Sequence, residues 1–246
     1  SRLLLNPSSR QVQSELAQPY EMHRTLMRAF PEVSTEADGK AREKFDMLFR
    51  ADVDDHGHHV VVYVQSAVEP DWSYLESIGN YLLENPTNPA CKRISNSLHE
   101  LRDGQILAFR LRANPTKRIA KPEEGYSELK GKRVGLLREE EQIDWLIRKG
   151  RERTQDVPGG FEILMNEVES ENGQVRLVPR VNVRLEGKRR SRKRENGHSY
   201  RTTHLAVRFD GLLRITKADA FRETLAKGIG PAKAYGFGLM SIAPAH

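Results

Sequence analysis

Apolar residues along the first 113 positions recur at the spacings of strands and helices in turn. Alternation or short apolar runs predict strands over 2–5, 44–50, 59–66 and 106–112, and helical periodicity predicts helices over 9–17, 19–30 and 71–83. Met22, Leu26, Ala29 and Phe30 give the second helix one apolar stripe. The order predicts a ferredoxin-like βαββαβ domain over residues 1–113.

A similar pattern follows in the second half of the chain. It predicts helices over 138–152 and 219–227 and strands over 161–167, 174–185, 202–209, 212–215 and 239–243. We expect a second, embellished ferredoxin-like domain over 133–246, joined to the first by a basic linker over 114–132. The predicted fold class is therefore α+β, with two tandem βαββαβ domains, RRM-like in topology, and antiparallel sheets.

Charge and composition narrow the class of partner. The chain has 40 Lys and Arg against 34 Asp and Glu, for a net charge of +6, which is compatible with a polyanionic ligand. The single cysteine, Cys91, excludes an internal disulfide and a cysteine-cluster zinc site, and favours the cytoplasm. No apolar run approaches the roughly 20 residues that span a bilayer, and no secretory leader is visible, so we expect no membrane association.

The segment 228–238 is rich in glycine and precedes the last predicted strand. Its order of helix, loop and strand is the reverse of a P-loop or dinucleotide fingerprint, which excludes both. A flexible backbone with outward amides would suit a phosphate. The alternative is a helix cap and turn that simply require glycine. The candidate phosphate-contacting residues of this loop are Gly230, Lys233, Gly236 and Gly238.

Two further segments are strongly basic. Residues 188–194 carry six positive charges in seven positions, between two predicted strands. On a hairpin tip they could follow the phosphates of duplex RNA, whose deep major groove hides its bases. Lys117 and Arg118 begin the basic linker, which could also touch RNA. In both cases the alternative is a solvated loop.

Carboxylates and histidines cluster over residues 54–59. Asp54, Asp55, His56, His58 and His59 could bind zinc or manganese. Asp and Gly also form the tight turns of hairpins, with polar side chains at the tip. We favour the hairpin interpretation and expect no metal site.

Tyr20 and His23 lie three residues apart, so they are neighbours at the start of the second helix. Metal-free RNA cleavage needs a base for the 2′-hydroxyl and an acid for the departing 5′-oxygen, and histidine can perform either transfer near neutral pH. His23 is the candidate for that transfer. Tyr20 could orient the phosphate, hydrogen-bond the nucleophile or share the proton transfer. A lone helical histidine can also be purely structural.

Several segments together resemble the CasE family, the endoribonucleases that process guide RNA in type I-E CRISPR systems and belong to the RAMP superfamily. The resemblance covers the whole chain and is carried, in the family's order, by Leu5-Asn6-Pro7, Pro19-Tyr20-Glu21-Met22-His23-Arg24-Thr25-Leu26, Glu69-Pro70-Asp71-Trp72-Ser73, the segment 109–118 and the segment 228–244.

The resemblance implies a metal-independent enzyme without a cofactor. Such enzymes cut the CRISPR repeat hairpin at its base, leave a 5′-hydroxyl and a 2′,3′-cyclic phosphate, and stay on the hairpin as a subunit of Cascade with its other proteins. Tyr20 and His23 match the family's active-site helix. A non-catalytic RNA-binding scaffold and a metal-dependent hydrolase remain alternatives. The full set of expected RNA contacts is Arg24, Lys117, Arg118, Lys188, Arg189, Arg190, Arg192, Lys193, Gly230, Lys233, Gly236 and Gly238.

Overall fold

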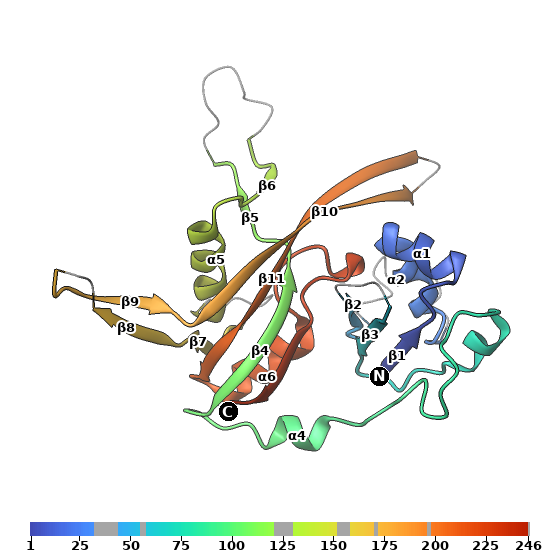
Figure 1. Cartoon of the computed structure of the whole chain (residues 1–246), viewed down its shortest axis with the longest axis horizontal. Coiled ribbons are helices and arrows are strands. Elements are labelled where there is room, and N and C mark those ends of the chain that lie inside the picture. Colours follow the sequence, from blue (N-terminus) through green and yellow to red (C-terminus); the bar gives the residue numbers. More distant parts are fainter. Residues whose placement is uncertain are drawn as a thin grey trace.

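The computed structural model describes residues 1–31, 44–54, 58–120, 130–151, 158–169, 172–195 and 198–245. Two ferredoxin-like units lie side by side, and the segment that contains α4 (Ser95–His99) crosses between them (Figure 1). Each unit has its own antiparallel sheet and its own hydrophobic core. The predicted α+β class with tandem ferredoxin-like domains is confirmed.

The first unit contains β1 (Arg2–Leu5), β2 (Leu48–Val53) and β3 (Val60–Gln65), in the antiparallel order β1-β3-β2. Helices α1 (Arg10–Ala17) and α2 (Pro19–Met27) follow β1. The alternation in β3 buries Val60, Val62 and Val64, as a sheet with one covered face requires. These residues share a core with the stripe of α2, including Met22 and Leu26.

The helix predicted over 71–83 is wrong in extent. Only a 3-10 turn, η1 (Ser73–Ser77), forms there. Beyond it Asn80 has a positive φ of 59°, so the chain turns, and isolated bridges then join Leu82 to Leu5 and Ala90 to Arg2. This segment is an irregular fourth edge of the first sheet. Trp72 and Leu75 are nevertheless buried, as their spacing predicted.

The second unit has the sheet order β10-β11-β4-β12. The strands are β4 (Ile106–Ala113), β10 (Val181–Glu195), β11 (His198–Ile215) and β12 (Met240–Pro244), and β7 (Phe161–Ile163) pairs with the end of β11. With β4 as the first strand, this is the ferredoxin-like order 4-1-3-2. Helices α5 (Glu139–Arg151) and α6 (Ala218–Lys227) belong to this unit.

The placement of 106–112 as the last strand of the first sheet is therefore wrong. β4 lies between β11 and β12, and its inward residues Leu107, Phe109 and Leu111 pack in the core that contains Trp145. Alternation shows that a strand has one buried face, but not which core that face joins.

Two small ribbons project from the second unit. The first pairs β5 (Thr116–Arg118) with β6 (Arg133–Gly135), and the second pairs β8 (Met165–Glu169) with β9 (Val175–Pro179). The strands predicted over 161–167 and 174–185 are each divided between a ribbon and the sheet. Those predicted over 202–209 and 212–215 are one strand, β11.

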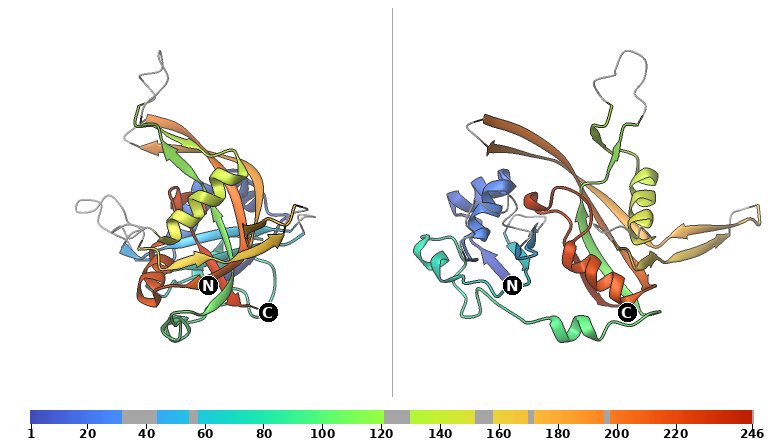
Figure 2. Two further views of the ribbon diagram at one scale, coloured as in Figure 1. Left: turned by 90° about the vertical axis from the view of Figure 1, so that its left-hand side faces the viewer. Right: turned by 180° about the vertical axis from the view of Figure 1, so that it is seen from behind.

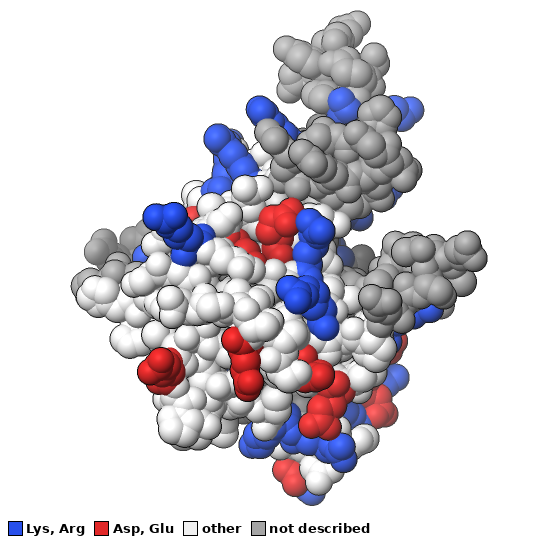
Figure 3. Space-filling view, turned by 90° about the vertical axis from the view of Figure 1, so that its right-hand side faces the viewer, with Lys and Arg blue, Asp and Glu red and all other residues white. Residues whose placement is uncertain are grey.

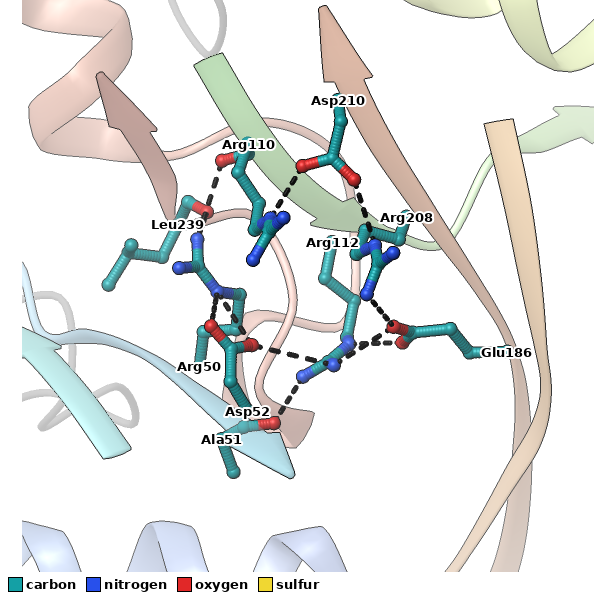
Figure 4. Close-up of polar contacts among 9 residues, drawn as sticks. All are labelled: Arg50, Ala51, Asp52, Arg110, Arg112, Glu186, Arg208, Asp210 and Leu239. Atoms are coloured by element: carbon teal, nitrogen blue, oxygen red, sulfur yellow. Dashed lines mark hydrogen bonds and ion pairs between the residues drawn. The ribbon is translucent and has the colours of Figure 1, made fainter. Parts of the chain in front are cut away.

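Arginines and carboxylates form an ion-pair network where the two sheets meet (Figure 4). The Arg112 side chain pairs with Glu186 of β10 and approaches Asp52 of β2 at 3.5 Å. Its Nη1 also donates to the Ala51 carbonyl. Arg50 pairs with Asp52 at 3.0 Å and donates to the Leu239 carbonyl at 3.4 Å. The network thus holds β2 of the first unit against β4, β10 and the start of β12.

Among the helices that the structure describes, none has the length and apolar character needed to cross a membrane.

Candidate active site

Helix α2 presents Tyr20 and His23 at the junction of the two units. Pro19 occupies its first turn, where a missing backbone N–H costs no hydrogen bond. Met22 and Leu26 are buried in the first core, whereas Tyr20 and His23 are half-buried on the flank. Arg24 is exposed and pairs with Glu21 at 3.0 Å. The periodicity of the helix therefore fixes which side chains face the junction.

A buried carboxylate below α2 holds the helix in place. Glu15 of α1 is 4% exposed and accepts hydrogen bonds from the hydroxyls of Thr25 and Tyr81, both at 2.6 Å. Gln11 donates to the same carboxylate at 2.9 Å. Burial, followed by the negative charge of Glu15, raises the pKa of Tyr81, so its phenol stays protonated as the donor. No local pattern in the chain indicated that this glutamate is buried.

Six rings gather beside the helix, and we call them the aromatic cluster. The Tyr20 and His23 centroids are 5.8 Å apart, and the His23 ring stacks on Phe49 of β2 at 6.2 Å. Tyr235, from η3 (Lys233–Tyr235), lies 5.6 Å from Tyr20. The cluster consists of Tyr20, His23, Phe49, His204, Tyr235 and Phe237.

His204 connects the second unit to this cluster. Its ring lies 4.4 Å from Tyr235 and 6.1 Å from Phe237. Asn114 fixes the imidazole: its Oδ1 accepts from the Leu205 N–H, which directs its amide nitrogen to His204 Nδ1 at 3.2 Å. Because the amide nitrogen is a donor, His204 Nδ1 is the acceptor and the ring proton resides on Nε2. Burial lowers the pKa of His204, which favours the neutral ring.

The glycine-rich loop is packed against both units. A Cβ on Gly228 would lie 2.7 Å from Leu48, one on Gly230 2.9 Å from Trp145, and one on Gly236 3.2 Å from Phe49. Each of these glycines, and Gly238, has a positive φ. The loop thus needs glycine to approach the protein closely and to turn.

The expectation that these amides face an anion is wrong at three positions. The N–H groups of Gly228, Gly236 and Gly238 donate to the carbonyls of Thr224, Lys233 and Arg112, respectively. The helix-cap alternative therefore describes the backbone of the loop, and the loop's contribution to the site is to deliver Tyr235 beside Tyr20. Lys233 is half-buried next to Gly238.

The basic run 188–194 lies within β10, paired with β11, rather than in a loop beyond the strands. We call the paired segments 188–194 and 199–205 the basic ribbon. Lys188 and Arg190 are exposed, whereas Arg189 is half-buried and lines a cavity of about 30 Å³ with Tyr235. Burial, and then the positive charge of Arg112, lowers the pKa of Arg189. In the register, Arg192 and Lys193 pair with Arg201 and Tyr200.

The ribbon passes over the candidate site. Helix α2 lies against β10, and β10 and β11 extend past α1 and α2 in both the front and rear views (Figures 1 and 2). On the face turned to the viewer in Figure 3, Lys and Arg side chains occur in the upper part, the end toward which this ribbon projects, and also along the lower edge, with Asp and Glu side chains between. A polyanion bound there would lie close to Tyr20 and His23.

Two other groups from the sequence lie elsewhere. Lys117 pairs with Glu141 of α5 at 2.8 Å and Arg118 is exposed on β5, so this part of the expected linker is a ribbon strand. In the histidine cluster, His59 Nδ1 lies 3.0 Å from Asp54. Asp55 and His56 lie outside the described residues. Across the described parts of the chain, no three potential metal ligands come together.

Sequence reasoning assigned Tyr20 and His23 but attached no role to Phe49, Asn114 or His204. These residues come from β2, from the end of β4 and from β11, and only the contact between the two units brings them together. Tyr235 was visible as an aromatic residue in a glycine-rich loop, which was the one available signal.

The chain is similar over its whole length to known proteins. Residues 1–244 match the family model described as CRISPR associated protein. The CRISPR-associated endoribonuclease Cse3 of Thermus thermophilus is 37% identical over 246 residues, which is 99% of each chain. A solved structure of Cse3 bound to a 19-nucleotide RNA has a TM-score of 0.69 at 34% identity, covering 99% of this chain and 98% of that one.

The Cascade subunit CasE of Escherichia coli K12 is 32% identical over 151 residues, which cover 59% of this chain and 61% of CasE. The whole-length match to the family model, together with these relatives, shows that the chain belongs to the CasE family of CRISPR-associated proteins.

Proposed function

We propose that this protein cleaves CRISPR precursor RNA at the base of the repeat hairpin and keeps the hairpin bound as a subunit of Cascade, in the cytoplasm. The observation that carries the proposal is the pair of Tyr20 and His23, held at the junction of two units below the basic ribbon. Membership of a family that includes the endoribonuclease Cse3 supports the reaction class.

In the proposed reaction the RNA supplies its own nucleophile. A base removes the 2′-hydroxyl proton, the 2′-oxygen forms a bond to phosphorus, and the bond from phosphorus to the 5′-oxygen breaks. An acid protonates that leaving oxygen, which yields a 5′-hydroxyl and a 2′,3′-cyclic phosphate. We assign one of the two proton transfers to His23. We assign to the Tyr20 hydroxyl a hydrogen bond to the same phosphate, because its ring centroid lies 5.8 Å from that of His23.

The surroundings suit this reaction. The stacking of His23 on Phe49 and the tilted packing of Tyr20 against Tyr235 hold both side chains before the RNA binds, so little ordering is needed at the reacting phosphate. Cations of the basic ribbon would offset the charge that develops on phosphorus, and Arg189 is a candidate because it lines the cavity beside Tyr235.

The test is single-turnover cleavage of the cognate repeat hairpin in EDTA, with the product ends mapped. We expect His23→Ala to lower the rate constant by about 10²- to 10⁴-fold while the hairpin still binds. Tyr20→Phe, which removes only the hydroxyl, should reduce the rate and leave the ring packing intact. His99→Ala, an exposed histidine on α4, is the matched control and should cleave like the wild type.

Other outcomes would reject the proposal. Tight binding without cleavage by the wild type would identify a non-catalytic scaffold. Cleavage that requires added metal and survives His23→Ala would move the reaction away from α2.

A further inference from the structure

The β8–β9 ribbon leaves the second sheet on the side opposite the tip of the basic ribbon, as the front and rear views both show (Figures 1 and 2). Every residue of β8 is exposed, and β9 is exposed over Val175, Arg176 and Leu177. At its base, backbone hydrogen bonds join Leu164 to Leu212 and Arg180 to Leu164. A two-stranded ribbon with exposed faces is at best marginally stable in water, so this one is incomplete by itself.

The two faces of this ribbon differ in chemistry. Residues opposite each other in an antiparallel pair share a face, and the register pairs Met165 with Pro179, Glu167 with Leu177 and Glu169 with Val175. Val175 and Leu177 are 63% and 61% exposed, among the most exposed large apolar side chains of the described residues. We call this surface the arm face: Met165, Glu167, Glu169, Val175, Leu177 and Pro179. The reverse face holds Asn166, Val168, Arg176 and Val178.

The charge of the arm face argues against RNA as its ligand. Its two charged residues, Glu167 and Glu169, are both carboxylates, which would repel phosphates. Exposed aliphatic side chains flanked by acids instead complement a protein surface that is apolar with Lys or Arg at its margin.

We propose that the arm face docks on a neighbouring protein subunit of Cascade that offers an apolar patch with a basic margin. The inference rests on membership of a family that includes a Cascade subunit, and does not depend on the roles of Tyr20 and His23. Because the arm and the basic ribbon project to opposite sides of the molecule, the protein partner and the RNA hairpin can be bound together.

The experiment measures binding of the labelled chain to the other Cascade subunits, assembled on a guide RNA that ends before the repeat hairpin, so that RNA does not bridge the two. The variant is Val175→Glu with Leu177→Glu on the arm face, and the matched control is Val168→Glu on the reverse face. We expect the arm-face variant to weaken binding by at least about tenfold, and the control to bind like the wild type. Hairpin cleavage should be unchanged in both, which shows that both fold.

Four results would overturn the proposal. The first is wild-type binding by the arm-face variant, and the second is equal weakening by Val168→Glu. The third is reduced hairpin RNA affinity in the arm-face variant, which would make the arm an RNA-binding element. Sedimentation of the chain alone tests the remaining occupant: a dimer that the arm-face variant abolishes would assign the arm to a second copy. Failure of the wild type to cleave RNA would reject the proposed function and leave this inference standing.

Discussion

His204 occupies a place in the site where a neutral imidazole is favoured. Burial lowers its pKa below the ordinary value of 6.5, and Asn114 donates to its Nδ1. In the unfolded chain the ring takes up a proton near pH 6.5, so below that pH the unfolded state binds more protons than the folded state. Its contribution to stability is therefore fully present above pH 6.5 and is lost as the pH falls toward the lower folded pKa.

We expect His204→Gln to flatten this part of the pH profile. Between about pH 7 and pH 5 the free energy of unfolding of the wild type should fall more steeply than that of the variant, by up to about 1.4 kcal/mol per pH unit. Urea unfolding at several pH values checks the result. His99→Gln, on exposed α4, should keep the wild-type slope. If the free energy of unfolding changes with pH equally in the wild type and in His204→Gln, burial does not lower the pKa of His204.

Gly236 leaves room for the Phe49 ring, on which the His23 ring stacks. A Cβ at this position would lie 3.2 Å from Phe49, and Phe49 stacks under His23. We expect Gly236→Val to displace Phe49 and to lower the cleavage rate constant by about 10²-fold, the size of effect that a shift of about 1 Å can produce.

Gly104→Val is the control that separates backbone strain from displacement of Phe49. Gly104 has the same φ of +80° as Gly236, but a Cβ there meets nothing within 4 Å. Both variants should therefore lose about 1–3 kcal/mol of stability from backbone strain, and only Gly236→Val should lose cleavage beyond that. Equal cleavage at a temperature where both variants are folded would show that the loop is only a cap.

The site could be predicted where a short motif sufficed, and not where tertiary packing was needed. Tyr20 and His23 are three residues apart on one helix, so periodicity places them together. The proximity of His204 to Tyr235, and the burial of Glu15, depend on how α1, β11 and the glycine-rich loop pack. Polar residue types carry no local signal of that burial.

At the scale of elements, the basic ribbon presents cations in two different environments along one strand. Alternation directs Lys188 and Arg190 to solvent, and brings Arg189 toward the cavity beside Tyr235. In the proposed function, the exposed residues would hold the RNA backbone and Arg189 would act near the reacting phosphate. A basic loop of undefined shape would not make that distinction.

The salt dependence of hairpin binding tests whether the exposed residues Lys188 and Arg190 contact RNA phosphates. Replacing Lys188 and Arg190 with Ala should reduce the slope of log K for the hairpin against log salt concentration by about 0.9 for each duplex phosphate that the variant no longer neutralises. The measurement is a set of binding titrations between about 50 and 200 mM salt. Arg214→Ala, at the far end of β11 in an exposed pair with Glu162, should leave the slope unchanged. A wild-type slope in the double variant would exclude the ribbon as the docking element.

The errors in predicting elements have physical causes. The helix expected over 71–83 fails because Gly79 and Asn80 turn the chain, and Asn80 adopts a left-handed conformation that ends helical hydrogen bonding. Strand 106–112 was placed in the wrong sheet because its local pattern is equally compatible with either core. Its pairing with β11 and β12 is set by residues that lie far away in the sequence.

At the scale of the whole molecule, the candidate active site depends on how the two units sit together. Tyr20 and His23 come from the first unit, and Tyr235 and His204 come from the second. The ion-pair network of Figure 4 lies at the same junction, and the Arg112 side chain is its link between β2 and β10. This network should therefore determine both stability and the alignment of the aromatic cluster.

Arg112→Met tests that dependence. The substitution keeps a long side chain but removes both hydrogen bonds from Arg112 to the largely buried Glu186, whereas Asp52 keeps its pair with Arg50. Because the remaining cation near Glu186, Arg208, lies 3.9 Å away, we expect a loss of up to about 3–5 kcal/mol in the free energy of unfolding. Arg214→Met, which breaks the exposed pair with Glu162, should cost at most about 1 kcal/mol. Urea unfolding measures both.

A double-mutant cycle and the cleavage rate test the same ion-pair network further. Adding Glu186→Gln to Arg112→Met removes the carboxylate that has lost its closest cation, so the double variant should be more stable than Arg112→Met alone. The double-mutant cycle gives the coupling between the two residues. Cleavage measured at a temperature where all variants are folded should still be slower without Arg112, because β2 carries Phe49 under His23 and keeps only the hydrogen bond from Arg50 to the Arg110 carbonyl as an anchor on β4. A cost no larger than that of Arg214→Met, together with wild-type cleavage, would show that apolar packing alone aligns the two units.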